Sequence, residues 1–242
     1  GNSGVYNLGH KASPVSRLKE YIQTVRCLLE HGEAVYHDRI VRLGWADKRI
    51  PIYVAAHAVK SLRLAGQIAD GVIIGTGTTP DVVKGALRAL REGASSVGRS
   101  VKDIDVWWSV PFNIQTDNDF RLDPQGGAAR EANYLARFTL EGKFISSSHK
   151  EGIKKLAEAY DLTTHGRPKP EQLERYDRLA EEYGVKAYLE ERFGGINGTP
   201  EKCIDVVQKN ADMGITQYSI NVPDLGRQER LKSMMNLVIN RL

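Results

Sequence analysis

The chain of 242 residues contains only two cysteines, no long apolar run and little excess of charge of either sign. Cys27 and Cys203 lie in helical patterns and have no metal-ligand spacing, so we expect no metal site and a reduced, cytoplasmic setting. No apolar stretch approaches the length of a membrane span, and residues 1–13 lack the apolar centre of a signal peptide. These absences predict no membrane partner.

The charge pattern argues against a nucleic-acid-binding protein. The formal net charge is +4, and the lysines and arginines alternate with acidic residues, as in residues 151–161 and 171–182. Such alternation is typical of solvated helix faces rather than of a basic stripe. A small anionic molecule is therefore a better expected ligand than DNA or RNA. With 41% hydrophobic residues, the composition is that of a globular protein with a sizeable core.

Along the chain, strand patterns alternate with helix patterns, which predicts an α/β fold with a parallel sheet. A helix is expected after Ser13-Pro14, and others at residues 58–69, 80–92 and 226–242. Short apolar runs predict strands at residues 49–56, 71–75, 104–114 and 214–223. Pro111 should interrupt the third of these strands or mark its end, because it has no N–H to donate.

Residues 115–198 depart from this alternation. They contain helical patterns near 127–141, 148–159 and 170–190 and no convincing strand. The segment is too long for a plain crossover and predicts a helical insertion within a single domain of residues 1–242. Two interpretations of the insertion stay open, a lid over a site and a packing extension or dimer surface.

The turn after the second predicted strand contains Gly75, Thr76, Gly77 and Thr78, and Pro80 starts the next helix. Free N–H groups of such a loop and of the first helical turn converge with the helix dipole, which favours an anion. Glycines allow close backbone approach and the threonines add hydroxyl donors. The spacing matches neither a Walker A loop nor the dinucleotide fingerprint. A phosphate site and a simple tight turn are both compatible with it.

The preceding strand also ends in small residues, Ala55 and Ala56, followed by His57 and Ala58 at a helix start. The carboxyl ends of neighbouring parallel strands lie on one face of a barrel, so both loops could contact one phosphate. His57 could add a hydrogen bond or part of a positive charge, or it could simply cap the helix.

The segments PIYVAA (51–56), LAGQIADGVI (64–73) and GTPE (198–201) together resemble the luciferase-like monooxygenase superfamily. This superfamily includes bacterial luciferase, alkanesulfonate monooxygenase and deazaflavin-dependent reductases. The resemblance implies an oxidoreductase with a (β/α)8 TIM-barrel fold that binds FMN or its 5-deaza relative, coenzyme F420, at the C-terminal face of the barrel. The cofactor phosphate would lie on the loops at residues 56–58 and 75–78.

The same resemblance implies further site residues and partners. Asn2, Ser3 and Tyr6 fall where the family contacts the ribityl chain or ring, although Asn2 and Ser3 also suit a turn. A small organic substrate would be oxygenated by reduced FMN and oxygen, or exchange a hydride with coenzyme F420. A separate flavin reductase and a homodimer are also implied. The resemblance names no catalytic acid or base.

The family barrel has eight strands, whereas this sequence predicts four and a stump at residues 1–3. Residues 1–4, GNSG, resemble the end of the family's fourth strand. We therefore expect the chain to be the C-terminal part of a longer protein and to carry strands five to eight. An alternative is that a second polypeptide supplies the other strands.

The remaining candidate residues have structural interpretations. We expect His10, His37 and His149 to be surface or loop histidines, because none has a suitably spaced partner. Asp70 suits a turn or cap better than proton transfer, and Trp107 and Trp108 suit the core.

Two rival classes are a shortened flavin-binding protein without catalysis and a phosphosugar isomerase or aldolase on the same barrel. The isomerase or aldolase should show a lysine or paired carboxylates at the strand ends, and residues 56–58, 75–78 and 222–224 contain no such set.

Overall fold

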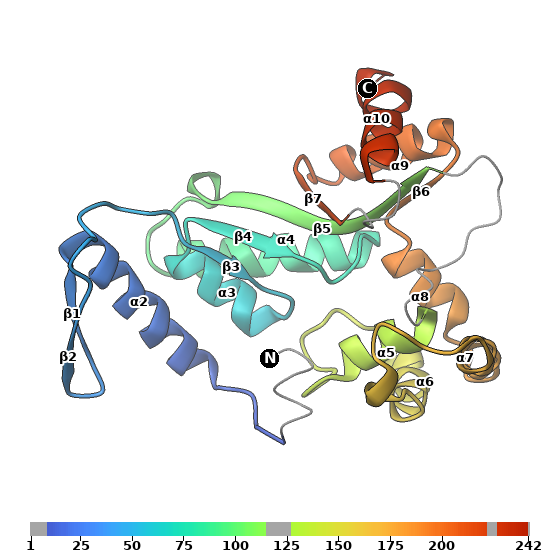
Figure 1. Cartoon of the computed structure of the whole chain (residues 1–242), viewed down its shortest axis with the longest axis horizontal. Helices are drawn as coiled ribbons and strands as arrows, with labels where there is room; N and C mark the ends of the chain where they lie inside the picture. Colours follow the sequence, from blue (N-terminus) through green and yellow to red (C-terminus); the bar gives the residue numbers. More distant parts are fainter. Residues whose placement is uncertain (1–8, 115–126, 222–226, 242) are drawn as a thin grey trace. The chain divides into compact units, whose positions relative to one another are not determined.

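The computed structural model describes residues 9–114, 127–221 and 227–241 (Figure 1). By its internal contacts the chain divides into two compact units. The first comprises Gly1–Ile74 and Ala86–Val106, and the second Gly75–Gly85 and Trp107–Leu242. We describe each unit by itself. None of the helices described is long and apolar enough to cross a lipid bilayer.

The first unit begins with helix α2 (Val15–His31). Gly32 ends this helix with φ of 72°, and its N–H donates to the carbonyl of Leu28 at 2.9 Å. A left-handed residue at this position is the usual way to end a helix, and glycine adopts that conformation without a steric penalty. The helix α2 packs against strand β1 and helix α3.

A β-hairpin follows, formed by β1 (Glu33–Tyr36) and β2 (Arg39–Arg42), and the sequence analysis did not predict it. The strands pair antiparallel, with Val35 opposite Ile40. His37 and Asp38 form the turn with φ of 48° and 59°. Two consecutive left-handed residues match the twist of a two-residue hairpin, but glycine or asparagine usually occupies such positions. The sequence of this turn therefore lacks the glycine or asparagine that commonly indicates a two-residue hairpin.

The next elements form a βαβ unit of β3 (Tyr53–Ala55), α3 (Val59–Ile68) and β4 (Gly71–Ile74). The strands β3 and β4 are parallel, with Ala55 opposite Ile73. The predicted strand 49–56 is thus shortened to three residues. Its beginning fails to pair as a strand because Pro51 has no N–H and the N–H of Ile52 donates to the Asp70 carboxylate.

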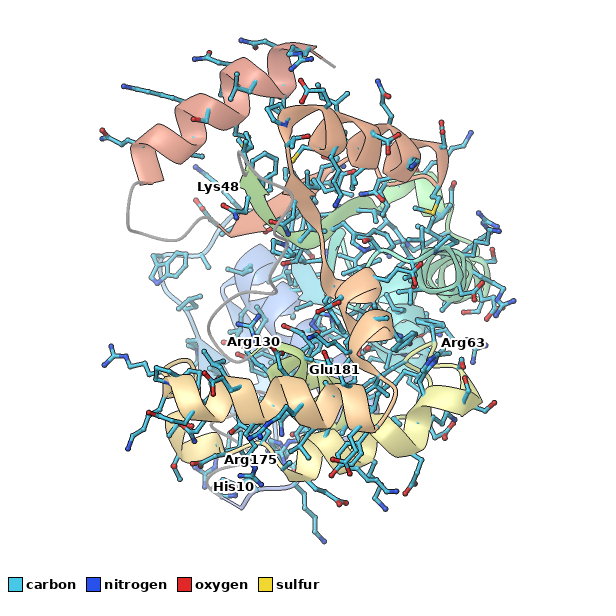
Figure 2. All side chains as sticks on the ribbon, turned by 90° about the vertical axis from the view of Figure 1, so that its right-hand side faces the viewer. His10, Lys48, Arg63, Arg130, Arg175 and Glu181 are labelled. Carbon is cyan, nitrogen blue, oxygen red and sulfur yellow. The ribbon has the colours of Figure 1, made fainter. Side chains whose placement is uncertain are left out.

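Helix α4 (Pro80–Ser95) follows the loop after β4, and its residues from Ala86 onward pack on α3 in the first unit. A Cβ at Gly66 would collide with the backbone of α4 at Leu90, so glycine is needed for this close approach. Arg63 of α3 pairs with Glu92 of α4 at 2.6 Å across the exposed side of the same contact (Figure 2 labels Arg63).

The short helix η1 (Val101–Asp103) and the first two residues of β5 (Asp105–Ile114) belong to the first unit. From Trp107 onward β5 belongs to the second unit, with β6 (Ile196–Gly198) and β7 (Tyr218–Asn221). The strand β5 pairs in parallel with β7 and then with β6. Strand β5 continues through Pro111, so the proline does not mark the end of the strand. Pro111 is the last residue of β5 in the described register with β7, and Phe112 begins the register with β6.

Four helices fill most of the predicted insertion: α5 (Gly127–Ala136), α6 (Ser147–Glu158), α7 (Pro170–Glu182) and α8 (Lys186–Phe193), with η2 (Leu162–Thr164). They share an apolar core that includes Ala132, Leu135, Leu156, Tyr176 and Leu189. The single helix predicted near 170–190 is broken at Gly184, where φ is 66°. The prediction that residues 115–198 contain no convincing strand was wrong, because β6 lies at their end; its three residues are too few to give a periodic signal.

The chain continues through α9 (Pro200–Asp212) to β7, and α10 (Arg227–Leu237) and η3 (Ile239–Arg241) follow. The side chain of Thr199 caps α9 by accepting from the N–H of Lys202 at 3.4 Å, and Pro200 occupies the first helical position. The GTPE segment is therefore a short strand end followed by a capped helix start.

Candidate functional site

The loop between β4 and α4 contains the four residues predicted to bind phosphate: Gly75, Thr76, Gly77 and Thr78. Strand β4 is buried up to Ile74, and α4 begins at Pro80 with Asp81 in its first turn. The N–H of Val83 bonds to the carbonyl of Thr79, which is the first intrahelical bond of α4. The strand–loop–helix arrangement expected from the sequence is confirmed.

Arg192 of α8 holds this loop from inside the second unit. It is completely buried, and its Nε donates to the carbonyl of Thr76 at 2.8 Å. Its own carbonyl accepts from the N–H of Thr78 at 3.0 Å. Arg192 was not predicted from the sequence, because it is 116 residues distant from Thr76. The only local signal was its place three residues after Leu189, on the buried face of α8.

Trp108 and Gly77 complete the support of the loop. The indole Nε1 of Trp108 donates to the carbonyl of Gly77 at 3.0 Å, and Trp108 is buried, as predicted for the core. Trp107 is half-buried. Gly77 has φ of 102°, and a Cβ there would collide with the backbone carbonyl of Arg192. Glycine is therefore needed here for packing against the protein's own backbone.

The side chain of Thr76 is the unusual feature of the loop. Thr76 is fully buried, and its hydroxyl has no hydrogen-bond partner among the residues that the structure describes. A buried polar group without a partner costs about 1–3 kcal/mol, so native proteins rarely retain one without a reason. A hydroxyl in this state can donate to a phosphate oxygen. The residues of the loop therefore fit a phosphate group.

The residues after β3 were predicted to offer N–H groups to the same phosphate. The N–H of Ala56 donates to the carbonyl of Ile73 at 3.0 Å. The N–H of Ala58 donates to the hydroxyl of Ser61 at 3.2 Å, at the start of α3. Both groups are thus paired within the first unit, and His57 is half-buried and makes interactions of its own. Asn2, Ser3 and Tyr6, the other predicted cofactor contacts, lie outside the described residues.

The three histidines His10, His37 and His149 differ in how far they are exposed. His10 and His37 are exposed, as expected. His149 was predicted to be a surface or loop histidine; it lies instead on helix α6, half-buried, and its ring stacks on Tyr188 with centroids 4.1 Å apart. Within the described ranges there is no group of three or more His, Cys, Asp or Glu side chains that could hold a metal ion.

A hollow of about 460 Å³ lies in the second unit beside the start of α4. Thr78, Thr79 and Pro80 line one side of it. Asn210 of α9 also lines it; this residue is buried, and its side-chain Nδ2 has no partner in the part of the chain that the structure describes. Asp205 pairs with Lys209, another lining residue, at 2.7 Å. The hollow places polar groups next to the positive end of α4.

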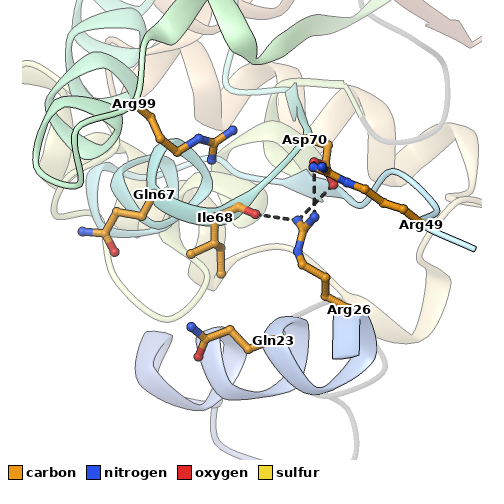
Figure 3. Close-up of a pocket in the computed structure, with 7 residues that line it drawn as sticks. All are labelled: Gln23, Arg26, Arg49, Gln67, Ile68, Asp70 and Arg99. Atoms are coloured by element: carbon orange, nitrogen blue, oxygen red, sulfur yellow. Dashed lines mark hydrogen bonds and ion pairs between the residues drawn. The ribbon is translucent and has the colours of Figure 1, made fainter. Parts of the chain in front are cut away.

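A second hollow, of about 320 Å³, lies in the first unit, where residues of α2, the end of α3 and Asp70 line it (Figure 3). Arg26 and Arg49 point toward the Asp70 carboxylate there, with contacts of 2.9 and 2.6 Å. Burial favours a raised pKa for Asp70, but hydrogen bonds from Arg26, the N–H of Ile52 and Arg49 outweigh burial and lower the pKa to about 2. Asp70 is thus an ionised structural group that ties α2 to the start of β3, in keeping with its predicted structural role.

The described strands β3 to β7 pair in parallel within each unit, and helices lie between them in the chain, as in an α/β fold. The family model of luciferase-like monooxygenases matches residues 2–217, and the chain belongs to this family. The sequence motifs that indicated the family are confirmed by this match.

Relatives in the same superfamily include F420-linked enzymes. A 5,10-methylenetetrahydromethanopterin reductase from Methanopyrus kandleri is 25% identical over an alignment of 226 residues that covers 88% of this chain and 58% of the relative. An F420-dependent glucose-6-phosphate dehydrogenase from Nakamurella multipartita is 35% identical over an alignment of 234 residues that covers 94% of this chain and 60% of the relative. The chain thus spans about three fifths of the length of these relatives.

Solved structures show the same fold. The coenzyme F420-dependent tetrahydromethanopterin reductase from Methanopyrus kandleri has a TM-score of 0.62 at 23% identity, covering 96% of this chain and 64% of that one. The long-chain alkane monooxygenase LadA has a TM-score of 0.55 at 17% identity, covering 99% of this chain and 59% of that one. The predicted fold class, α/β of the luciferase-like barrel type, is therefore confirmed.

Proposed function

We propose that this chain belongs to a deazaflavin-dependent oxidoreductase that transfers a hydride between coenzyme F420 and a small organic molecule. The observation that carries the proposal is the buried, unpaired hydroxyl of Thr76 in the loop before α4. The relatives that are named as F420-dependent enzymes support the deazaflavin over FMN as the cofactor. When bound, the deazaflavin would supply the hydride chemistry, and the protein would orient it and shape access to it.

In this proposal the second unit binds the cofactor phosphate through its own groups. The hydroxyl of Thr76 donates to a phosphate oxygen, and the first-turn N–H groups of α4 face the same charge. Arg192 and Trp108 engage the carbonyls of Thr76 and Gly77, which keeps these oxygens from repelling an anion. The backbone of the loop is then held in place before the ligand arrives, whereas the side chain of Thr76, which is fully buried without ligand, must become accessible to the phosphate.

The other predicted contacts remain part of the proposal. His57, in the first unit, would offer a hydrogen bond or a partial positive charge to an anion. Asn2, Ser3 and Tyr6 would contact the ribityl chain or the ring. FMN with oxygen, delivered by a flavin reductase, is the corresponding proposal for a monooxygenase, and the two cofactors are compared in the same experiment.

The test is a fluorescence titration of the 242-residue chain with coenzyme F420 and, separately, with FMN. In Gly75→Asp the new carboxylate would lie near the phosphate. At about 4 Å and an effective dielectric constant near 20, one like-charge contact costs on the order of 4 kcal/mol. Even a third of that value weakens binding about tenfold. Gly44→Asp is the control, because it adds the same charge at an exposed glycine with open space around it.

The expected result is tighter binding of F420 than of FMN by the wild type, a loss of at least tenfold in Gly75→Asp, and no change in Gly44→Asp. Tighter binding of FMN would favour the monooxygenase. Equal affinities in wild type and Gly75→Asp would mean that the loop is only a turn, and the phosphate site would be abandoned.

A further inference from the structure

Arg192 is a buried charge whose described partners are all neutral. Its guanidinium donates to the carbonyls of Thr76, Lys143 and Phe144 at 2.8, 2.6 and 3.1 Å, and to the hydroxyl of Tyr188 at 2.6 Å. The hydrogen bonds satisfy the N–H groups, but no carboxylate is among these acceptors. A completely buried charge is costly unless something compensates it.

The contacts of Arg192 connect three segments of the second unit. Thr76 belongs to the loop before α4, Lys143 and Phe144 lie between α5 and α6, and Tyr188 belongs to α8. The Arg192 carbonyl also accepts from the N–H of Thr78, so this one residue contacts the loop through both its side chain and its backbone. The helical insertion therefore reaches the loop through Arg192.

The charge of Arg192 also acts on its surroundings. Lys143 places its ammonium group against the carbonyls of Leu135 and Arg137 at 2.8 and 2.9 Å, at the end of α5. Burial, and then the positive charges of Arg137 and Arg192, lower the pKa of Lys143 to about 8. A positive potential thus surrounds Arg192, and an anion on the neighbouring loop would relieve it.

We propose that Arg192 is a positioning residue that fixes the loop of Gly75, Thr76, Gly77 and Thr78 for the cofactor phosphate and supplies the positive charge that the bound phosphate balances. This inference rests on the proposed function and extends it, because it assigns a role in cofactor binding to the helical insertion. It also gives a reason for a completely buried arginine in the insertion.

Arg192→Lys is the main variant, because lysine keeps the charge but cannot reproduce the planar guanidinium fork that donates to the carbonyls of two segments and to the Tyr188 hydroxyl at once. Arg192→Met removes the charge as well. Arg175→Gln is the charge control, since Arg175 lies exposed on α7 of the same helical cluster (Figure 2). Tyr188→Phe is the structural control, because it removes one hydrogen bond of Arg192 that does not involve the loop.

Two measurements are made on each full-length variant after its fold is checked by circular dichroism. The first is hydrogen exchange of the amides at residues 76–79 without ligand. The second is the dissociation constant for coenzyme F420. We expect faster exchange and about tenfold weaker binding in Arg192→Lys, and a larger loss in Arg192→Met. Arg175→Gln and Tyr188→Phe should change both quantities less than twofold.

The outcomes separate this inference from the proposed function. If the wild type binds F420 and Arg192→Lys binds it equally well with unchanged exchange, the role of Arg192 is refuted while the function stands. If Tyr188→Phe weakens binding as much as Arg192→Lys, Arg192 has a general structural role and the inference fails. If the wild type binds neither F420 nor FMN, the proposed function fails, and unchanged exchange in Arg192→Lys would then refute the loop-fixing role separately.

Discussion

Thr76 carries a hydroxyl that folding removes from water without giving it a partner among the described residues. Valine has nearly the same shape as threonine and no hydroxyl, so Thr76→Val separates stability from binding. The free energy of unfolding without ligand should stay the same or rise by about 1 kcal/mol, because an unpaired polar group is removed. Affinity for coenzyme F420 should fall about tenfold, because a donor to the phosphate is lost.

Urea unfolding and the F420 titration measure the two effects. Thr24→Val is the control, since the hydroxyl of Thr24 donates to the carbonyl of Glu20 at 2.9 Å on exposed α2. That variant should lose a little stability and keep its affinity. A loss of stability in Thr76→Val with unchanged affinity would show that the hydroxyl serves the fold rather than the ligand.

At the residue scale, the sequence predicted the loop but not what supports it. Gly75, Gly77 and Pro80 give a local signal, because glycine and proline have defined conformational roles in a turn and at a helix start. Arg192 gives none, because its importance comes from a contact between segments that are distant in the chain. Gly77 illustrates the same limit, since its neighbour is the backbone of Arg192.

At the element scale, long periodic segments were predictable and short ones were not. The helices α3 and α4 follow an apolar period that the sequence shows directly. The strand β6 has three residues, and the β1–β2 turn uses His37 and Asp38 in place of asparagine or glycine. In both cases the strand forms because it pairs with another strand, and the residue pattern within one short segment does not reveal that pairing.

The Asp70 carboxylate connects α2 with the β3–α3–β4 unit, so removing the carboxylate should lower the stability of all these elements. Its native pKa of about 2 lies below its usual value of 3.8. As the pH falls, the Asp70 carboxylate therefore takes up a proton in the unfolded chain before it does so in the folded protein. The contribution of Asp70 to the free energy of unfolding is present above pH 4 and is lost as the pH falls toward 2. The shift corresponds to about 2 kcal/mol at neutral pH.

Asp70→Asn should lower the free energy of unfolding at pH 7 by about 3 kcal/mol, because Arg26 and Arg49 lose the carboxylate. Its unfolding free energy should also fall less than that of the wild type between pH 4 and pH 2. Urea titrations over this range measure both effects, with exposed Asp47→Asn as the control for a lost negative charge. Parallel pH profiles of wild type and Asp70→Asn would refute the role of Asp70.

At the scale of the whole molecule, the alternation of strands and helices predicted the parallel α/β class, and the combined motifs predicted the family. Neither predicted how β5 divides its pairing between β6 and β7. Parallel strands need long connections, so their register depends on contacts made across many residues. The sequence therefore indicates the class of fold better than the arrangement of its strands.

The first unit exposes a set of large apolar side chains on and near its hairpin: Val35, Ile40, Val41, Trp45, Ile50 and Tyr53. Val35 and Ile40 are opposite each other across the two strands, so both point to the same side of the hairpin. Exposed apolar residues grouped in this way are typical of a surface that another protein covers. A second copy of this chain is the partner that the family resemblance implies.

We therefore predict a homodimer that uses the hairpin. Sedimentation of the wild type at micromolar concentration should give twice the chain mass of 26.9 kDa. Val35→Lys combined with Ile40→Lys should weaken the dimer at least tenfold, because each lysine must lose water to be buried. Phe138→Lys, at an exposed apolar residue of the second unit, should leave the dimer intact. A monomeric wild type would refute the dimer, and a dimer unaffected by the paired lysines would refute the hairpin as its interface.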